Sequence, residues 1–278
     1  MNRDPLKNQD DRDPSLPTPQ SQVRAFGEPG LRSGFQKIFV LTGAGISAES
    51  GIPVFQGTNW RGHSHYDLAN IEAWERDPKL VWEYYSDRRA RARDAKPNAA
   101  HIALAQWEKD RGAGGLFLCT QNVDGLHEAA GSQEVIHIHG KLFESRCAAA
   151  CGRPAFADHN GYAESELPRC PCGALARPNV CWFGEQPYHL DRIDDALEMC
   201  EVFIAIGTSG SVQPVASFVT MLKQRPRPAR TVFLGLTEPA NAKYFDEVHL
   251  GPAAELVPQA MRSLNKLLRQ DQKGSTLR

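Results

Sequence analysis

No run of apolar residues in this 278-residue chain approaches the roughly 20 that a membrane-spanning helix requires. An excess of positive charge is also missing, because 32 Lys and Arg stand against 33 Asp and Glu, a formal net charge of -1. That balance argues against a protein that binds nucleic acid through a basic surface. The N-terminal stretch has neither the apolar core of a secretory signal nor the acid-poor composition of a transit peptide. We therefore expect a cytoplasmic protein without membrane contact or direct nucleic-acid binding. We also expect a monomer, although none of these features bears on the oligomeric state.

The first residues of the chain are polar, charged and interrupted by prolines. Such a segment buries too little apolar surface to offset the conformational entropy that ordering costs. Residues 1–33 are therefore predicted to form a disordered tail, and residues 266–278 a second tail at the C-terminus. The chain as a whole has 41% apolar and 23% charged residues, which is typical of a globular protein.

The remaining sequence alternates short apolar runs with longer helical patterns. Apolar runs that end in glycine or polar residues are typical of buried parallel strands, and the stretches between them are typical of crossover helices. This order predicts an α/β fold, a Rossmann-like parallel sheet covered by helices, whose ligands bind beyond the carboxyl ends of the strands. The predicted strands are 37–42, 116–120, 202–207 and 231–234, and the predicted helices include 98–107 and 214–222.

Two segments interrupt this alternation and divide the chain into parts. Residues 57–97 are predicted to be helical and are rich in charged and aromatic side chains. Residues 141–180 are predicted to be irregular and hold four clustered cysteines. Both are interpreted as insertions that together form a smaller lobe. The Rossmann-like domain then consists of residues 34–56, 98–140 and 181–265.

A glycine-rich turn, Gly43-Ala44-Gly45, directly follows the first predicted strand. Glycines let a backbone approach a pyrophosphate closely, and the helix start that follows offers free N–H donors. The full dinucleotide fingerprint is absent, because Ala48 takes the place of its third glycine, and a simple tight turn would explain these residues as well. A second turn, residues 207–209, ends another predicted strand. Two such turns favour a dinucleotide ligand over a tight turn alone.

The seven cysteines of a cytoplasmic chain are not expected to form a disulfide framework. Two close pairs, Cys147 with Cys151 and Cys170 with Cys172, resemble a structural zinc site in which four thiolates close a tetrahedron. Neither gap has the commonest two-residue spacing, and free or redox-active cysteines are the alternative. A closed four-sulfur site leaves no open position for catalysis, so the predicted Zn²⁺ is structural. The other three cysteines are expected to be small buried hydrophobic residues: Cys119, Cys181 and Cys200.

Five motifs, taken in order along the chain, resemble the signatures of the sirtuin family. The resemblance extends from about residue 35 to 260 and is strongest to the compact bacterial branch. The cysteine quartet lies in the place that the family pattern requires. The motifs are Gly43-Ala44-Gly45-Ile46-Ser47-Ala48-Glu49-Ser50-Gly51-Ile52-Pro53, Thr120-Gln121-Asn122-Val123-Asp124-Gly125-Leu126-His127, His137-Ile138-His139-Gly140, Trp182-Phe183-Gly184-Glu185 and Gly207-Thr208-Ser209.

This resemblance implies an NAD-dependent protein-lysine deacylase, a transferase that yields nicotinamide and O-acyl-ADP-ribose and acts on acyl-lysine proteins or peptides. It implies that His139 is the general base, since imidazole can accept a proton near neutral pH, and that Asn122 and Asp124 position the nicotinamide ribose and carboxamide. A histidine satisfied at a strand end is the alternative for His139. The implied cofactor contacts, besides Asn122 and Asp124, are Gly43, Ala44, Gly45, Phe55, Gln56, Gln121, Gly207, Thr208, Ser209, Gly235 and Ala253. The residues implied to bind the substrate backbone as an added strand are Val180, Phe183, Gly184 and Glu185.

One short stretch refines the substrate prediction. Tyr85 and Arg88 resemble the Tyr-x-x-Arg of sirtuins that remove succinyl, malonyl or glutaryl groups. An Arg fork can bind a carboxylate bidentately, and residues three apart on a helix share a face. Ala69 matches the small residue that leaves room for the longer acyl chain. The alternative is a solvated basic run, 88–93, whose other arginines are expected to face water. We expect a desuccinylase and demalonylase that also accepts acetyl-lysine.

Two departures from the family pattern affect the expected reaction. Gln56 stands where the family usually has an arginine beside the cofactor, and Gly235 stands where an asparagine is usual near the adenosine ribose. The change at Gln56 favours two alternatives on the same fold, an ADP-ribosyltransferase and an NAD hydrolase. A non-catalytic binder of NAD or acyl-peptide is a third, but intact Asn122, Asp124 and His139 argue against it.

Overall fold

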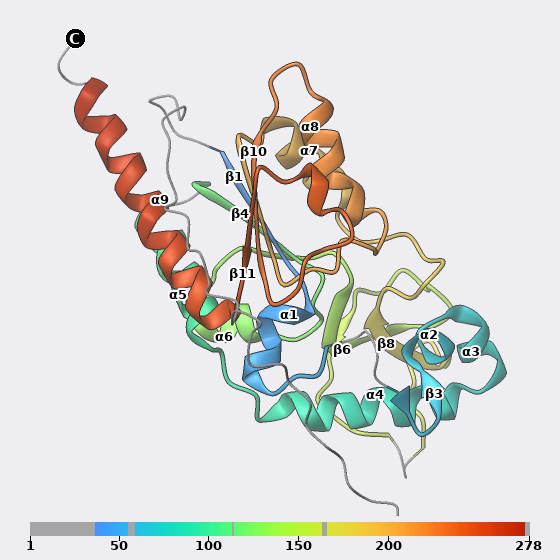
Figure 1. Cartoon of the computed structure of the whole chain (residues 1–278). Coiled ribbons are helices and arrows are strands. Elements are labelled where there is room, and N and C mark those ends of the chain that lie inside the picture. The colour runs from blue at the N-terminus through green and yellow to red at the C-terminus, as the bar shows by residue number, and fades with distance from the viewer. Residues whose placement is uncertain (1–36, 55–58, 113, 163–165, 276–278) are drawn as a thin grey trace, which may run out of the picture.

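The computed structural model describes residues 37–54, 59–112, 114–162 and 166–275 (Figure 1). The predicted tail at residues 1–33 lies outside the described residues, as do Phe55 and Gln56. No helix in the described ranges combines the length and the hydropathy that a membrane crossing needs.

A sheet of six parallel strands forms the centre of the molecule, in the order β11-β10-β9-β1-β4-β5. This confirms the predicted α/β fold. Four strands match predicted runs, whereas β5 and β11 are short and carry too few apolar residues to stand out in the sequence. The chain leaves β1 toward β4 on one side and reaches β9 on the other, so the ends of β1 and β9 form the point where ligands bind in such sheets. The strands are β1 (Ile38–Thr42), β4 (Leu116–Thr120), β5 (Val135–His137), β9 (Val202–Ile206), β10 (Arg230–Gly235) and β11 (Glu247–Leu250).

Both faces of this sheet are buried, as alternation along β1 shows. Ile38 and Val40 pack into one cluster with residues of α5 and α9, while Phe39 and Leu41 pack into another with residues of α7 and α8. In Figure 1, α5 and α9 run along one side of the sheet and α7 and α8 cover the other. Helix α9 includes most of the segment predicted as a C-terminal tail. The bounds are α5 (Ala99–Arg111), α6 (Leu126–Ala130), α7 (Leu190–Met199), η2 (Val215–Ser217), α8 (Phe218–Gln224), η3 (Ala242–Tyr244) and α9 (Ala253–Ser275).

The segment after β1 begins with a short helix and continues into the helical insertion. Each insertion helix starts at a residue whose side chain accepts a backbone N–H, which satisfies a donor that the helix itself leaves unpaired. These caps are Ser64, Asn70 and Asp77, the last followed by Pro78 at the first helical position. The elements are α1 (Ala44–Ser47), η1 (Ala48–Ser50), β2 (Asn59–Trp60), β3 (His63–Ser64), α2 (His65–Leu68), α3 (Ile71–Arg76) and α4 (Pro78–Arg93).

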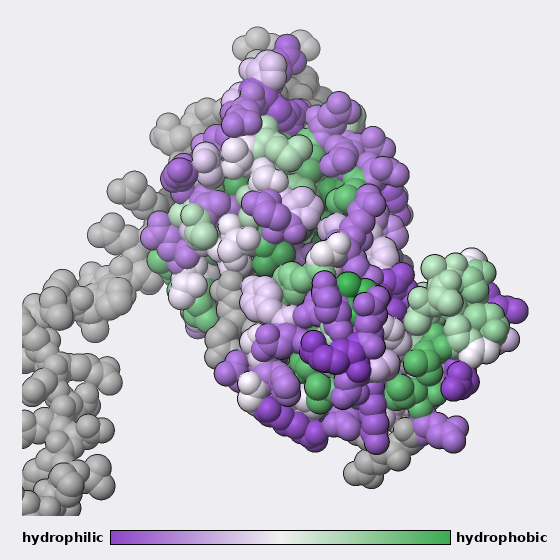
Figure 2. Space-filling model, turned by 90° about the vertical axis from the view of Figure 1, so that its right-hand side faces the viewer, coloured by the Kyte–Doolittle hydropathy of each residue, from purple (hydrophilic) through white to green (hydrophobic). Residues whose placement is uncertain are grey.

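The prediction of irregular structure for residues 141–180 was wrong. Strands β6 (Gly140–Cys147), β7 (Phe156–Ala157) and β8 (Ala176–Val180) form an antiparallel sheet in the order β7-β6-β8. Charged residues, prolines and a long connection hide these strands in the sequence, because their pairing partners lie far along the chain. A third apolar cluster joins this sheet to the helical insertion, with Leu142 and Val180 against the aromatic side chains of α4. On the face that Figure 2 turns toward the viewer, hydrophobic residues lie in separate groups among hydrophilic ones.

Candidate functional site

A cavity of about 680 Å³ lies between the carboxyl ends of β1, β4, β9 and β10 and the smaller sheet and helices. It brings together residues that are far apart in the sequence. All the predicted catalytic, cofactor and acyl-pocket residues within the described ranges line it, except Ala253. The lining residues that were predicted are Gly43, Ala44, Gly45, Ala69, Tyr85, Arg88, Gln121, Asn122, Asp124, His139, Val180, Phe183, Gly184, Glu185, Gly207, Thr208, Ser209 and Gly235.

The two glycine turns at the ends of β1 and β9 lie directly against each other. The amide of Gly45 donates to the carbonyl of Gly207 at 2.9 Å. A Cβ atom on Gly45 would stand 2.7 Å from the Cα atom of Gly207, closer than side chains tolerate. Gly207 also has a φ of +61°, in the left-handed region that favours glycine. The glycines are therefore required by the close contact of the two turns, and this contact places both turns at one wall of the cavity.

Asn122 and Asp124 follow β4 and are held by the first turn of the chain after β1. The Asn122 amide donates to the carbonyl of Gly43 and to the Ser47 hydroxyl, both at 3.1 Å. The Ser47 hydroxyl in turn donates to Asp124 at 3.0 Å. Burial raises the pKa of Asp124 above its ordinary value of 3.8, and the hydrogen bonds from Leu126 and Ser47 only partly offset this. The two side chains thus have fixed orientations at the cavity wall.

His139 follows β5, and its ring nitrogens have different surroundings. Nδ1 lies 3.1 Å from the carbonyl oxygen of Gln121. Because a carbonyl can only accept, Nδ1 carries the proton, and neutral His139 has its acceptor at Nε2. Burial lowers the pKa of His139 below 6.5, with the hydrogen bond to Gln121 acting in the opposite direction. At neutral pH the ring is therefore an uncharged base at the cavity.

The residues predicted to bind the acyl group lie on α4 and at the end of α2. Arg88 lines the cavity and donates to the Tyr84 hydroxyl at 3.3 Å. That hydroxyl also lies 2.6 Å from Nδ1 of His65, at the start of α2. Tyr85 is fully buried, which raises the pKa of its hydroxyl well above 10 and keeps it protonated. The pocket thus combines a cation with a neutral hydroxyl, a pairing that suits a carboxylate.

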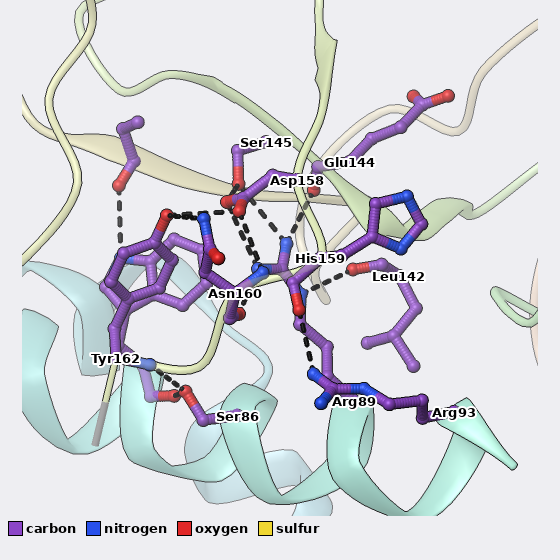
Figure 3. Close-up of polar contacts among 12 residues, drawn as sticks. Ser86, Arg89, Arg93, Leu142, Glu144, Ser145, Asp158, His159, Asn160 and Tyr162 are labelled. Carbon is purple, nitrogen blue, oxygen red and sulfur yellow. Dashed lines mark hydrogen bonds and ion pairs between the residues drawn. The ribbon is translucent and has the colours of Figure 1, made fainter. Parts of the chain in front are cut away.

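One expectation for the basic run after Tyr85 was wrong, because Arg89 does not face water. Its side chain is fully buried and forms an ion pair with Asp158 at 3.1 Å. Figure 3 shows Arg89 reaching from α4 across to Asp158 and Ser145, beside the backbone of the smaller sheet. The other acceptors are the carbonyl groups of Leu142, Asn160 and Glu144. Arg89 differs from its neighbours because its side of α4 packs on this sheet.

The segment predicted to pair with substrate, residues 180–185, is already extensively bonded within the chain. The amides of Cys181 and Phe183 donate to the carbonyls of His139 and Ala69, both at 2.9 Å. The amide of Trp182 donates to the carboxylate of Glu185, and the amide of Glu185 to the carbonyl of Trp182. A substrate strand would therefore have to use carbonyl groups of this segment and the amide of Gly184.

Glu185 lines the cavity, but its carboxylate is engaged within the protein. Arg177 donates to both of its oxygens, at 2.6 and 2.9 Å, and Arg146 donates at 3.0 Å. Burial alone would raise the pKa of Glu185, but the hydrogen bonds from Arg177 and Trp182 and the two guanidinium charges hold it below its usual range. In this structure Glu185 therefore anchors the segment and does not offer a free carboxylate.

The four clustered cysteines meet at the end of β6, with all four sulfur atoms within 4.8 Å of one another. The Sγ atoms of Cys147 and Cys172 are 3.6 Å apart, as are those of Cys151 and Cys170. Sulfur atoms on a tetrahedron with Zn–S bonds of about 2.3 Å lie about 3.8 Å apart. The observed separation of 3.6 Å is too long for a disulfide bond and fits a zinc ion held by four thiolates.

The outcome for the remaining predicted residues is mixed. Ala253 is 3% exposed and packs in the apolar cluster between the sheet and α9, and it is not among the residues that line the cavity. Trp182 and Tyr84 line the cavity but were not predicted as site residues. The signal for Trp182 was its place inside a sirtuin motif. Tyr84 had no such signal, since a tyrosine in an aromatic-rich helix is more often a core residue.

Comparisons with known proteins show the family of this chain. The model of the Sir2 family matches residues 43–214. An NAD-dependent protein deacylase of Caulobacter vibrioides is 45% identical over 81% of this chain and 95% of its own length. One of Escherichia coli K12 is 43% identical over 84% of each chain. A crystal structure of a Sir2 homolog–NAD complex superposes with a TM-score of 0.76 at 40% identity, over 83% of this chain and 90% of that one.

Proposed function

Because this chain belongs to the Sir2 family and is an NAD-dependent protein deacylase, we propose that its preferred substrates carry an acidic acyl group, such as succinyl or malonyl, on lysine. The observation that carries this proposal is the presence of Arg88 and Tyr85 in the same cavity as His139. A guanidinium fork binds a carboxylate bidentately, and a protonated phenol can add a third hydrogen bond. Acetyl-lysine lacks that carboxylate and makes none of these contacts.

The roles proposed for the other residues follow from their positions. When bound, NAD supplies the ribose carbon to which the acyl oxygen is transferred as nicotinamide leaves. The turns 43–45 and 207–209 would hold its phosphates and adenosine, and Asn122 and Asp124 its nicotinamide side. His139 would then accept a proton at Nε2 from a ribose hydroxyl.

The division of the chain is proposed on the same grounds. The large domain with the parallel sheet would bind NAD, while the smaller lobe supplies the acyl pocket. Zinc on Cys147, Cys151, Cys170 and Cys172 would hold the smaller sheet in shape without joining the chemistry. Acyl-lysine proteins or peptides are the proposed partners. A solved structure described as Sir2 bound to acetylated peptide, 27% identical with a TM-score of 0.69, supports a peptide site in this fold.

The proposal is tested with matched succinyl- and acetyl-lysine peptides, NAD and the pure protein. Nicotinamide and free lysine are measured together for the wild type and for Arg88→Met. We expect a higher kcat/KM for the succinyl peptide in the wild type. The substitution should raise KM for that peptide by about 10- to 100-fold, the effect of losing hydrogen bonds to a charged group, and far less for the acetyl peptide. Arg93→Met, which removes a charge from the same helix outside the cavity lining, is the matched control.

The possible results separate the proposal from its alternatives. An equal effect of Arg88→Met on both peptides would show that this residue does not recognise the carboxylate. Nicotinamide release without free lysine would indicate NAD hydrolysis or ADP-ribosylation. Neither product would indicate a non-catalytic binder of NAD or acyl-peptide.

A further inference from the structure

We propose that Trp182 is a positioning residue for the acidic acyl group, because its indole N–H turns the Tyr85 hydroxyl into a hydrogen-bond donor for the substrate carboxylate. This inference rests on the proposed function and deepens it. It assigns acyl specificity to a residue outside the pair on α4.

The hydrogen bond between these two side chains has only one possible direction. Nε1 of Trp182 lies 3.0 Å from the hydroxyl oxygen of Tyr85. An indole N–H can only donate, so the phenol oxygen is the acceptor. The phenol proton must then point away from Trp182. Among the described residues, no acceptor for that proton is paired with Tyr85.

An incoming carboxylate supplies the missing acceptor. Tyr85 is fully buried, and a buried hydroxyl proton without an acceptor is unfavourable. The guanidinium carbon of Arg88 lies 5.8 Å from the centre of the Tyr85 ring, and both residues line the cavity. A carboxylate bound by Arg88 could therefore also accept from Tyr85. An acetyl group ends in a methyl and cannot.

Trp182 can orient Tyr85 because its own position is determined from several sides. The guanidinium carbon of Arg177 lies 3.2 Å from the centre of the Trp182 ring. Arg177 is fixed by both carboxylate oxygens of Glu185, and the Trp182 amide donates to that carboxylate at 2.8 Å. The ring of Trp74 also packs on Trp182, at 5.7 Å between centres. The indole is therefore held rigidly against Tyr85.

This bond also joins two parts of the proposed substrate site. Trp182 lies between the residues proposed to contact the substrate backbone, whereas Tyr85 belongs to the acyl pocket on α4. The same indole thus links the segment beside the peptide to the group that would bind the acyl carboxylate. Such a link lets one side chain contribute to acyl specificity without contacting the acyl group.

The test is a double-mutant cycle on acyl specificity, using Trp182→Phe, Tyr85→Phe and the double variant. Trp182→Phe keeps an aromatic ring and removes the N–H. The readout is the ratio of kcat/KM for the succinyl peptide to that for the acetyl peptide. Each single variant is expected to lower this ratio by about 10- to 100-fold, the effect of one hydrogen bond to a charged group. The double variant should be no worse than Tyr85→Phe alone, because Trp182 acts through that hydroxyl.

Trp107→Phe is the matched control, because it removes the N–H of an indole that donates to Asn265 and that is not among the residues lining the cavity. It should change the ratio far less. Melting temperature and zinc content are measured for every variant. Losses that multiply in the double variant, or equal losses on both peptides in Trp182→Phe, would overturn the role of Trp182 while leaving the acidic acyl preference intact. A wild type without that preference would overturn the proposed function and this inference together.

Discussion

At the scale of single residues, two histidines at the end of β5 have different surroundings. His137 is 3% exposed, with its nitrogens 3.0 Å from the carbonyl of Asn122 and 2.8 Å from Glu128. His139 makes one backbone contact, to Gln121, and lines the cavity. Both ring nitrogens of His137 thus have hydrogen-bond partners within the protein. Such a structural role was the alternative considered for His139. Of these two histidines, only His139 is among the residues that line the cavity.

His139→Tyr should therefore reduce deacylation by about 10²- to 10⁴-fold, the usual contribution of a general base. Since burial lowers the pKa of His139, the base is unprotonated above 6.5, and kcat/KM of the wild type should fall only at pH values below that. Steady-state rates between pH 5 and 8 measure both effects. Unchanged melting temperature and zinc content serve as the control. Normal turnover in the variant would remove His139 from this role.

At the scale of elements, helix α4 serves two surfaces with adjacent residues. Arg88 lines the cavity, while Arg89 crosses to the smaller sheet. The five N–H groups of a guanidinium match the five acceptors around Arg89 in Figure 3, which are the carbonyls of Leu142, Glu144 and Asn160 with the side chains of Ser145 and Asp158. Arg89 therefore ties the helix that carries Arg88 to the sheet of β6, β7 and β8.

Arg89→Met should lower the free energy of unfolding by about 3–5 kcal/mol, because it leaves Asp158 buried without its partner. Adding Asp158→Asn should recover part of this loss, since no unpaired charge then remains. Urea unfolding measures both, with Arg93→Met as a control that removes only an exposed bond to the carbonyl of His159. An equal decrease in the free energy of unfolding for Arg89→Met and Arg93→Met would show that Arg89 does not stabilise the contact between α4 and the smaller sheet.

The same ion pair has a defined pH dependence. Burial alone would raise the pKa of Asp158, but the hydrogen bond from Ser145 and the charge of Arg89 hold it below 3.8. A carboxyl group with a lowered pKa stabilises the folded state above its unfolded pKa and loses that effect as the pH falls through the folded value. The wild type should therefore have a higher free energy of unfolding than Asp158→Asn at neutral pH, and this difference should disappear at pH values below 3.8.

At the scale of the whole molecule, the cavity lies between cores that are packed separately. Two apolar clusters cover the faces of the parallel sheet, and a third joins the helical insertion to the smaller sheet. The four-cysteine site lies next to the smaller sheet, because Cys147 is the last residue of β6 and Cys151 follows four residues later. Loss of zinc should consequently affect the smaller lobe first.

Removing zinc with a chelator should abolish deacylation and expose the smaller lobe before the parallel sheet. Hydrogen exchange measures this, with faster exchange expected in β6, β8 and α4 than in β1 and β9. Cys172→Ser should likewise lower the zinc content below one ion per chain. Cys200→Ala, at a buried cysteine of the large domain, should leave it at one. Uniform loss of protection across both lobes would contradict the independence of the smaller lobe.

Much of this molecule could be predicted because its signals are local. The strand Leu116–Thr120 was predicted with its observed bounds, since an apolar run between polar ends identifies a buried parallel strand. The short spacing within each cysteine pair likewise predicted that the four cysteines form one zinc site. The antiparallel sheet at residues 140–180 and the burial of Arg89 were not predicted, because both depend on partners 11 to 71 residues away.

The sequence by itself determined the parallel sheet, the family and the types of residue that meet in the cavity, because periodicity and motifs are properties of neighbouring residues. The tertiary structure alone decided which of them face the cavity and how they are oriented. Adjacent arginines on α4 face different surfaces, the carboxylate of Glu185 is taken up by two arginines, and the proton of Tyr85 is directed by a tryptophan 97 residues away. Each outcome follows from hydrogen-bond partners that only folding brings within reach.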